Sequence, residues 1–251
     1  MRRASAVLGS MILAAWAAAA QAQVDTAMVH VGPQDGGTEA FVSWPAGKAA
    51  APGIVVVQEW WGLNNQIRDV ARRLSREGYV AIVPDLYHGK VATDPEQAHV
   101  LLRGLENDVA LEELSGAIRW LRAEPRVGKK HIGVVGFCMG GGLAQKLAMK
   151  SQEISAVVMF YGLTATDAKS LAGLHAPVQG HFGEQDDGIP IVKVEALRSG
   201  LKQAGKTGEI YLYAGAGHAF MNDTRPSYHP DAARQGWARM LAFFQKNLRR
   251  S

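Results

Sequence analysis

The chain has 251 residues, a formal net charge of +4 and one cysteine. Basic and acidic residues are interspersed, which argues against nucleic-acid binding. A single cysteine excludes an internal disulfide, and no His, Cys and carboxylate set has metal-ligand spacing. No Gly-x-Gly-x-x-Gly follows a strand-like run, so we expect neither a metal nor an organic cofactor.

The first residues are typical of a signal peptide. Arg2 and Arg3 precede an apolar run over 6–20, and Ala20-Gln21-Ala22 fits the small-x-small cleavage rule. The apolar run is too short for a membrane span, so we expect none in the mature chain. These features predict a signal peptide over 1–22, export to the periplasm, and one mature domain over 23–251.

Strand-like runs alternate with amphipathic helices along the mature chain. Residues 28–31 and 40–44 are expected to form an opening hairpin around Gly36-Gly37. Further strands are expected at 54–57, 79–83, 131–137, 156–161, 178–182 and 209–213. Helices are expected at 64–77, 109–122, 143–150, 191–204 and 232–247. Another helix is expected to start at Thr93, where Thr93 and Glu96 have the spacing of a capping box. The alternation predicts a single α/β domain with a mostly parallel sheet, helices on both faces and no large lid.

Polar side chains follow five of the expected strands. In sheets of this kind, ligands bind outside the carboxyl ends of the strands, so these side chains are expected to gather at one edge. They are Gln58 to Trp61, Asp85 to His88, Cys138, Glu184 to Asp187, and His218.

Cys138 lies in the turn Gly136-Phe-Cys-Met-Gly140, between an apolar run and a helix-like stretch. This Gly-x-Cys-x-Gly spacing is typical of a nucleophile elbow, with sulfur in place of the usual serine hydroxyl. Glycines are needed there because the strand and helix backbones approach closely. The alternative is a buried structural thiol, since free cysteine is among the most buried residue types.

A reactive thiol needs a base, and the base needs a third group that fixes its tautomer. Cys138, an aspartate and His218 each follow an expected strand, in the chain order nucleophile, acid, histidine. Spacing alone does not separate Asp186 from Asp187 as the acid. The other candidate histidines are interpreted as structural (His131, His175, His181), loop (His229) or pocket-lining (His88).

Five motifs together make the chain resemble the dienelactone hydrolase (carboxymethylenebutenolidase) family of the α/β-hydrolase superfamily over nearly all of the mature length. They are Gln58-Glu-Trp-Trp-Gly62, Pro84-Asp-Leu-Tyr87, Gly136-Phe-Cys-Met-Gly-Gly141, Gly183-Glu-Gln-Asp-Asp-Gly-Ile-Pro190 and Gly217-His-Ala-Phe220. Any one of these motifs alone would be weak evidence for the family, whereas the five together are specific.

The resemblance implies roles for single residues. Cys138 would be the nucleophile, Asp186 the acid and His218 the base, and Glu59 would restrain the resting thiol, because a nearby carboxylate disfavours thiolate. Glu59 has two plainer interpretations, a cap on the following helix or an ion pair with Arg68. The backbone N–H groups of Trp60 and Met139 are expected to form the oxyanion hole.

Two arginines that hold the substrate carboxylate in dienelactone-cleaving members are replaced here by Gly89 and Asn222. Neither Lys90 nor Arg225, which lie nearby in sequence, is at an equivalent position, which argues against dienelactone itself. We expect a substrate pocket lined by aromatic and polar side chains, although core packing explains the aromatic ones equally well. Its candidate residues are Trp61, Tyr87, His88, Lys90, Phe220, Asn222 and Arg225.

The sequence therefore predicts an exported, monomeric carboxylic ester hydrolase that cleaves small-molecule esters or lactones through a thioester. Simple aryl or alkyl esters are the alternative substrates. The main alternative from another class is a non-catalytic α/β-hydrolase-like binding protein. Thiol redox chemistry is poorly supported, because there is no Cys-x-x-Cys.

Overall fold

A computed structural model describes residues 22–32, 37–47, 49–127 and 129–249 of the chain. Its centre is one eight-stranded sheet in the order β1-β2-β4-β3-β5-β6-β7-β8. The strands are β1 (Val24–Val31), β2 (Thr38–Pro45), β3 (Gly53–Val57), β4 (Val80–Pro84), β5 (Ile132–Phe137), β6 (Ile154–Phe160), β7 (Val178–Gly183) and β8 (Gly208–Tyr213). The helices are α1 (Asn65–Arg76), α2 (Pro95–Gly104), α3 (Asn107–Ala123), α4 (Met139–Lys150), α5 (Ala168–Leu171), α6 (Ile191–Gln203) and α7 (Pro230–Leu248).

The strands from β4 and β3 through β8 are parallel, whereas β2 runs antiparallel to both β1 and β4. The expected mostly parallel α/β fold is thus confirmed. The expected opening hairpin is present with longer strands, paired from Val24 with Pro45 to Val31 with Thr38. Gly36, in its expected turn, lies outside the described residues, as do residues 1–21 of the expected signal peptide.

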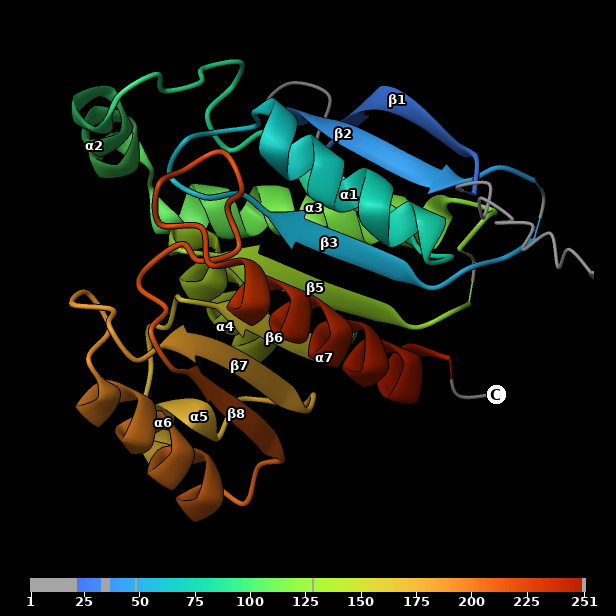
Figure 1. The fold of residues 1–251 in the computed structure, drawn as a ribbon. Helices are drawn as coiled ribbons and strands as arrows, with labels where there is room; N and C mark the ends of the chain where they lie inside the picture. The colour runs from blue at the N-terminus through green and yellow to red at the C-terminus, as the bar shows by residue number, and fades with distance from the viewer. Residues whose placement is uncertain (1–21, 33–36, 48, 128, 250–251) are drawn as a thin grey trace, which may run out of the picture.

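Helices cover both faces of the sheet (Figure 1), and an apolar layer packs them against each face. Residues of α1 and α7 pack on one face, and residues of α3, α4, α5 and α6 pack on the other. The central strands are apolar throughout because both of their faces are covered; all five residues of β3 are buried. Burial of apolar area on both faces is the main driving force for this arrangement.

Several helix ends differ from expectation for local reasons. The cap of α2 is Asp94, whose Oδ1 accepts the Gln97 N–H at 2.9 Å, and not Thr93. Helix α4 begins at Met139, directly after the turn, and not at Leu143 as expected. The glycines of its first turn are helical although glycine has a low helix propensity. The short helix α5 was not expected; Asp167 caps it through the Ser170 N–H.

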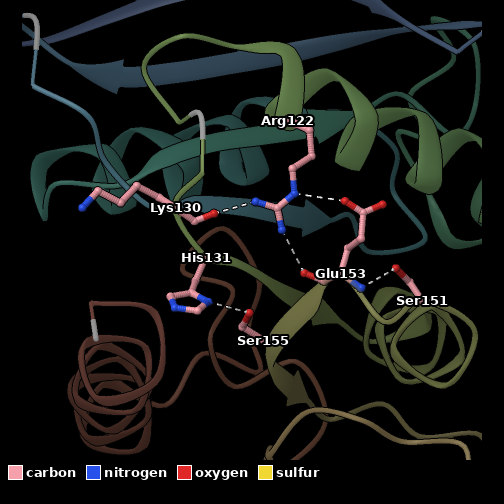
Figure 2. Close-up of polar contacts among 6 residues, drawn as sticks. All are labelled: Arg122, Lys130, His131, Ser151, Glu153 and Ser155. Carbon is pink, nitrogen blue, oxygen red and sulfur yellow. Dashed lines mark hydrogen bonds and ion pairs between the residues drawn. The ribbon is translucent and has the colours of Figure 1, made fainter. Parts of the chain in front are cut away.

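The amino ends of β5 and β6 are joined to α3 by a polar network (Figure 2). The Arg122 guanidinium pairs with Glu153 at 3.0 Å and donates to the Lys130 carbonyl. His131 Nδ1 lies 3.1 Å from Ser155 Oγ. His131 therefore has a structural contact at the sheet edge opposite the strand carboxyl ends.

Within the described residues, no helix is both long enough and apolar enough to cross a membrane.

Candidate active site

Cys138 occupies the sharp turn between β5 and α4. Its backbone has φ 54° and ψ −121°, a conformation that L-residues rarely adopt. Tyr161 and Ala219 also have positive φ, at 38° and 60°. Such backbone strain is found mainly where function requires it, and here it is concentrated at the carboxyl ends of the strands.

Glycines make this turn possible. A Cβ on Gly136 would collide with the Gly140 carbonyl oxygen, and one on Gly140 would collide with the backbone of Val57 and Gln58. A Cβ on Gly162, which follows β6, would likewise collide with the carbonyl oxygen of Cys138. The turn that carries Cys138 is therefore fixed by direct backbone contacts with its neighbours, which only glycine permits at these three positions.

Cys138, His218 and Asp186 form a continuous chain of polar contacts. His218 Nε2 lies 3.1 Å from Cys138 Sγ, and His218 Nδ1 lies 2.8 Å from Asp186 Oδ2. The other Asp186 oxygen accepts the N–H groups of Gly188 at 2.9 Å and Ile189 at 3.1 Å. The carboxylate is thus fixed on both sides, which orients the imidazole toward the sulfur.

This arrangement shifts the pKa values of its members. Burial lowers the pKa of His218, but the hydrogen bonds and charges of Asp186 and Cys138 outweigh burial and raise it to about 10. Burial raises the pKa of Asp186, yet the hydrogen bond from His218, with those from Ile189 and Gly188, brings it below its usual value. The geometry therefore favours an imidazolium held between a carboxylate and a sulfur.

The structure also separates the two adjacent aspartates. The Asp186 side chain is fully buried and contacts His218, whereas Asp187 is exposed to solvent. Only Asp186 is placed to orient the imidazole.

Glu59 lies buried beside this chain of contacts. Its two oxygens accept hydrogen bonds from Tyr161 Oη at 3.0 Å and Asn222 Nδ2 at 2.7 Å. Burial raises the pKa of its carboxyl, although Asn222, Tyr161 and the His218 charge act in the opposite direction. Among the described residues Glu59 has no ion pair with Arg68, and the cap of α1 is Asn64. Neither plainer interpretation of Glu59 holds.

Two backbone donors at the site are unused. Neither the Trp60 N–H nor the Met139 N–H has a hydrogen-bond acceptor within the part of the chain that the structure describes. Met139 is the first residue of α4, where an N–H has no partner inside the helix. Such free donors are what an oxyanion hole requires.

A cavity of about 380 Å³ opens over Cys138 and His218. This volume is in the range of small-molecule sites, and the lining is mostly apolar. Besides these two residues and Met139, the lining comprises Leu102, Leu105, Asn107, Gly142, Leu143, Lys146, Tyr161, Gly162, Leu163, Thr164 and Ile189.

None of the seven expected pocket residues lines this cavity. Asn222 and Phe220 are buried, and the Arg225 guanidinium lies 3.5 Å from the centre of the Trp61 ring. Tyr87, His88 and Lys90 line a separate cavity beside α2, and His88 Nε2 lies 3.0 Å from Glu113 Oε1. Tyr87 nevertheless touches the site, because its hydroxyl lies 3.4 Å from Met139 Sδ.

Sequence reasoning missed Tyr161 and Gly162, which line the cavity. The Tyr161 ring lies 5.2 Å from the His218 ring, and its hydroxyl holds Glu59. Their position in the sequence could have indicated this role, because Tyr161 and Gly162 directly follow the apolar run of β6, at the end of a strand where site residues are expected. No group of three or more His, Cys, Asp or Glu side chains among the described residues is placed to hold a metal ion.

The strand order, the elbow and the His-Asp pair after later strands define an α/β-hydrolase. The sequence profile of the dienelactone hydrolase family matches residues 38–248. The chain belongs to the dienelactone hydrolase family and is a hydrolase.

Relatives from several bacteria agree with this membership. A protein of Methylorubrum extorquens provisionally named carboxymethylenebutenolidase is 32% identical over 87% of this chain and 80% of its own length. One of the same provisional name from Escherichia coli is 38% identical over 78% and 77%. The crystal structure of a provisionally named dienelactone hydrolase from Klebsiella pneumoniae has a TM-score of 0.81 and 31% identity, covering 89% of this chain and 99% of its own.

Proposed function

We propose that the protein hydrolyses carboxylic esters or lactones, with Cys138 as the nucleophile and a thioester as the intermediate. The observation that carries the proposal is the contact chain from Cys138 Sγ through His218 to Asp186, at 3.1 and 2.8 Å, at the floor of a mostly apolar cavity. A nucleophile, a base within reach and a group that orients the base are the parts that acyl transfer requires.

In the first half of the reaction, the Cys138 thiolate attacks the ester carbonyl carbon. The carbonyl oxygen becomes an oxyanion, which the N–H groups of Trp60 and Met139 stabilise. His218, as imidazolium, gives its Nε2 proton to the leaving alkoxide oxygen as the C–O bond breaks. The products are an alcohol and a thioester on Cys138.

In the second half, neutral His218 accepts a proton from water, and the hydroxide attacks the thioester carbonyl. The C–S bond then breaks, releasing a carboxylic acid and restoring the thiolate beside the imidazolium. For a lactone, the alcohol and acid are parts of one product. Asp186 stays ionised throughout, since its hydrogen bonds hold its pKa low.

The substrate is proposed to be an aryl or alkyl ester, or a lactone, other than dienelactone. The Asn222 amide is buried against Glu59, and the N–H of Gly89 donates to Asp85, so neither position offers a cation. A role for Glu59 in restraining the thiol fits its buried place beside His218, and export to the periplasm would give that restraint a use against oxidation.

A panel of 4-nitrophenyl esters and simple lactones tests the proposal. The native protein should turn over part of the panel, and Cys138→Ala should lose this activity while its circular dichroism stays native. Met149→Leu, a volume-conserving change on the same helix away from the cavity lining, is the matched control and should keep full activity. Turnover of no ester or lactone would favour a binding protein instead.

A further inference from the structure

One cation faces the otherwise uncharged part of the cavity over Cys138. Lys146 lies on α4, and it shares the cavity wall with Met139, Gly142 and Leu143 of that helix. Residues three, four and seven positions apart lie on one face of a helix, so Lys146 is on the face of α4 that starts at the turn holding Cys138. Apart from the reacting Cys138 and His218, it is the only lining side chain in the described part of the chain that carries a charge at neutral pH.

Lys146 is positioned but not neutralised. Its Nζ donates to Asn107 Oδ1 at 2.9 Å, and Asn107, at the start of α3, also lines the cavity. No carboxylate lies within ion-pair distance of Lys146 among the described residues. The neighbouring acid, Asp108, pairs instead with Lys150, one turn further along α4. Lys146 is half-buried and its contact with Asn107 is exposed to solvent, so its ammonium can attract an anion in the cavity and salt screens that attraction.

The helix geometry sets where such an anion would sit. Lys146 follows Cys138 by eight positions, which corresponds to about 12 Å along a helix axis. Helical side chains lean toward the amino end, which brings the ammonium back toward the thiol. Between the two, Gly142 lines the cavity, and the methyl group of Thr164 packs where its side chain would be.

We propose that Lys146, held by Asn107, determines specificity by binding a carboxylate on the substrate, several atoms away from the scissile carbonyl. The substrate class is then a half-ester or lactone with an apolar body, which fits Leu102, Leu105, Leu143, Leu163 and Ile189, and an acidic far end. This inference rests on the proposed ester hydrolysis, and it places the anion site on α4, away from Gly89 and Asn222.

A pair of substrates tests the proposal: mono-4-nitrophenyl adipate, which has a free carboxylate, and its methyl ester, which is uncharged. The native protein should prefer the carboxylate by about tenfold in kcat/KM, the size expected for one charge-assisted hydrogen bond. Lys146→Met should remove this preference by slowing only the acidic substrate, and Lys146→Arg should retain most of it. Added salt should weaken the preference in the native protein.

Lys150→Met is the matched control, since it removes a lysine from the same helix outside the cavity lining. It should keep the native preference. Equal loss on both substrates in Lys146→Met, or an unchanged ratio, would overturn the role of Lys146 while leaving ester hydrolysis intact. Failure of the native protein to cleave either ester would contradict the hydrolase proposal, and this inference with it.

Discussion

The Asp186 carboxylate lies 2.8 Å from the Nδ1 atom of His218, while the adjacent Asp187 points into solvent. The carboxylate is buried and fixed by two backbone N–H groups of its own turn. The imidazole therefore has one orientation, with Nε2 toward the sulfur.

Asp186→Asn should reduce kcat on the order of a thousandfold or more, because loss of the orienting carboxylate of a serine triad has an effect of that size. Stopped-flow or steady-state hydrolysis of a 4-nitrophenyl ester measures it. Asp187→Asn is the matched control and should retain native rates. Equal effects of the two substitutions would contradict the assignment of Asp186.

The His218 imidazole should hold its proton far into the alkaline range, since Asp186 and Cys138 raise its pKa to about 10 against the opposing effect of burial. NMR titration of the histidine ring protons measures this directly. In Asp186→Asn the pKa of His218 measured in the same way should be lower, because the carboxylate that raises it is gone. A native His218 that titrates near 6.5 would contradict this electrostatic account.

The same shift has a consequence for stability. Because the folded pKa lies above the unfolded value of 6.5, the protonated imidazole stabilises the fold fully below pH 6.5 and progressively less up to about pH 10. The difference in the free energy of unfolding between the native protein and His218→Gln should therefore narrow as pH rises through this window. Urea unfolding at several pH values measures it.

Gly162 should be essential for the elbow, because a Cβ there would collide with the Cys138 carbonyl oxygen. Gly162→Ala should lower the free energy of unfolding by about 2–4 kcal/mol, the range for forced overpacking and backbone strain. Gly104→Ala, where a Cβ would meet nothing within 4 Å, is the control and should be neutral or slightly stabilising. Urea unfolding compares them, and a stable Gly162→Ala would refute the packing argument.

Glu59 should slow the reaction of the thiol with electrophiles if its buried carboxylate disfavours thiolate. Glu59→Gln keeps the size of the side chain and should increase the rate of Cys138 alkylation by iodoacetamide. The measurement follows the intact mass over time, with Glu184→Gln, an exposed change, as control. An unchanged or slower alkylation rate would count against the restraining role.

The parts of this molecule that depend on local backbone chemistry were open to prediction from the sequence. The elbow follows from the glycines around Cys138, and the sheet follows from apolar runs that alternate with helices. Spacing left Asp186 and Asp187 equally possible, and only the family resemblance pointed to Asp186, because the choice depends on how the turn after β7 folds back on its own N–H groups.

The cavity lining was also beyond reach, for a tertiary reason. Lys146 and Leu105 have ordinary helix and loop positions in the sequence, and they line the cavity over Cys138 only because α2, α3 and α4 converge there. Conversely, Arg225 and Asn222 follow His218 closely in sequence, yet their side chains turn toward Trp61 and Glu59.

The most direct test of the central claim is intact-protein mass spectrometry after rapid acid quench of the enzyme with 4-nitrophenyl acetate. The native protein should show a transient mass increase of one acetyl group, located on Cys138 by peptide mapping, together with release of nitrophenol. Cys138→Ala should show neither. Sustained turnover without an adduct on Cys138, or turnover retained in Cys138→Ala, would contradict covalent catalysis by this thiol.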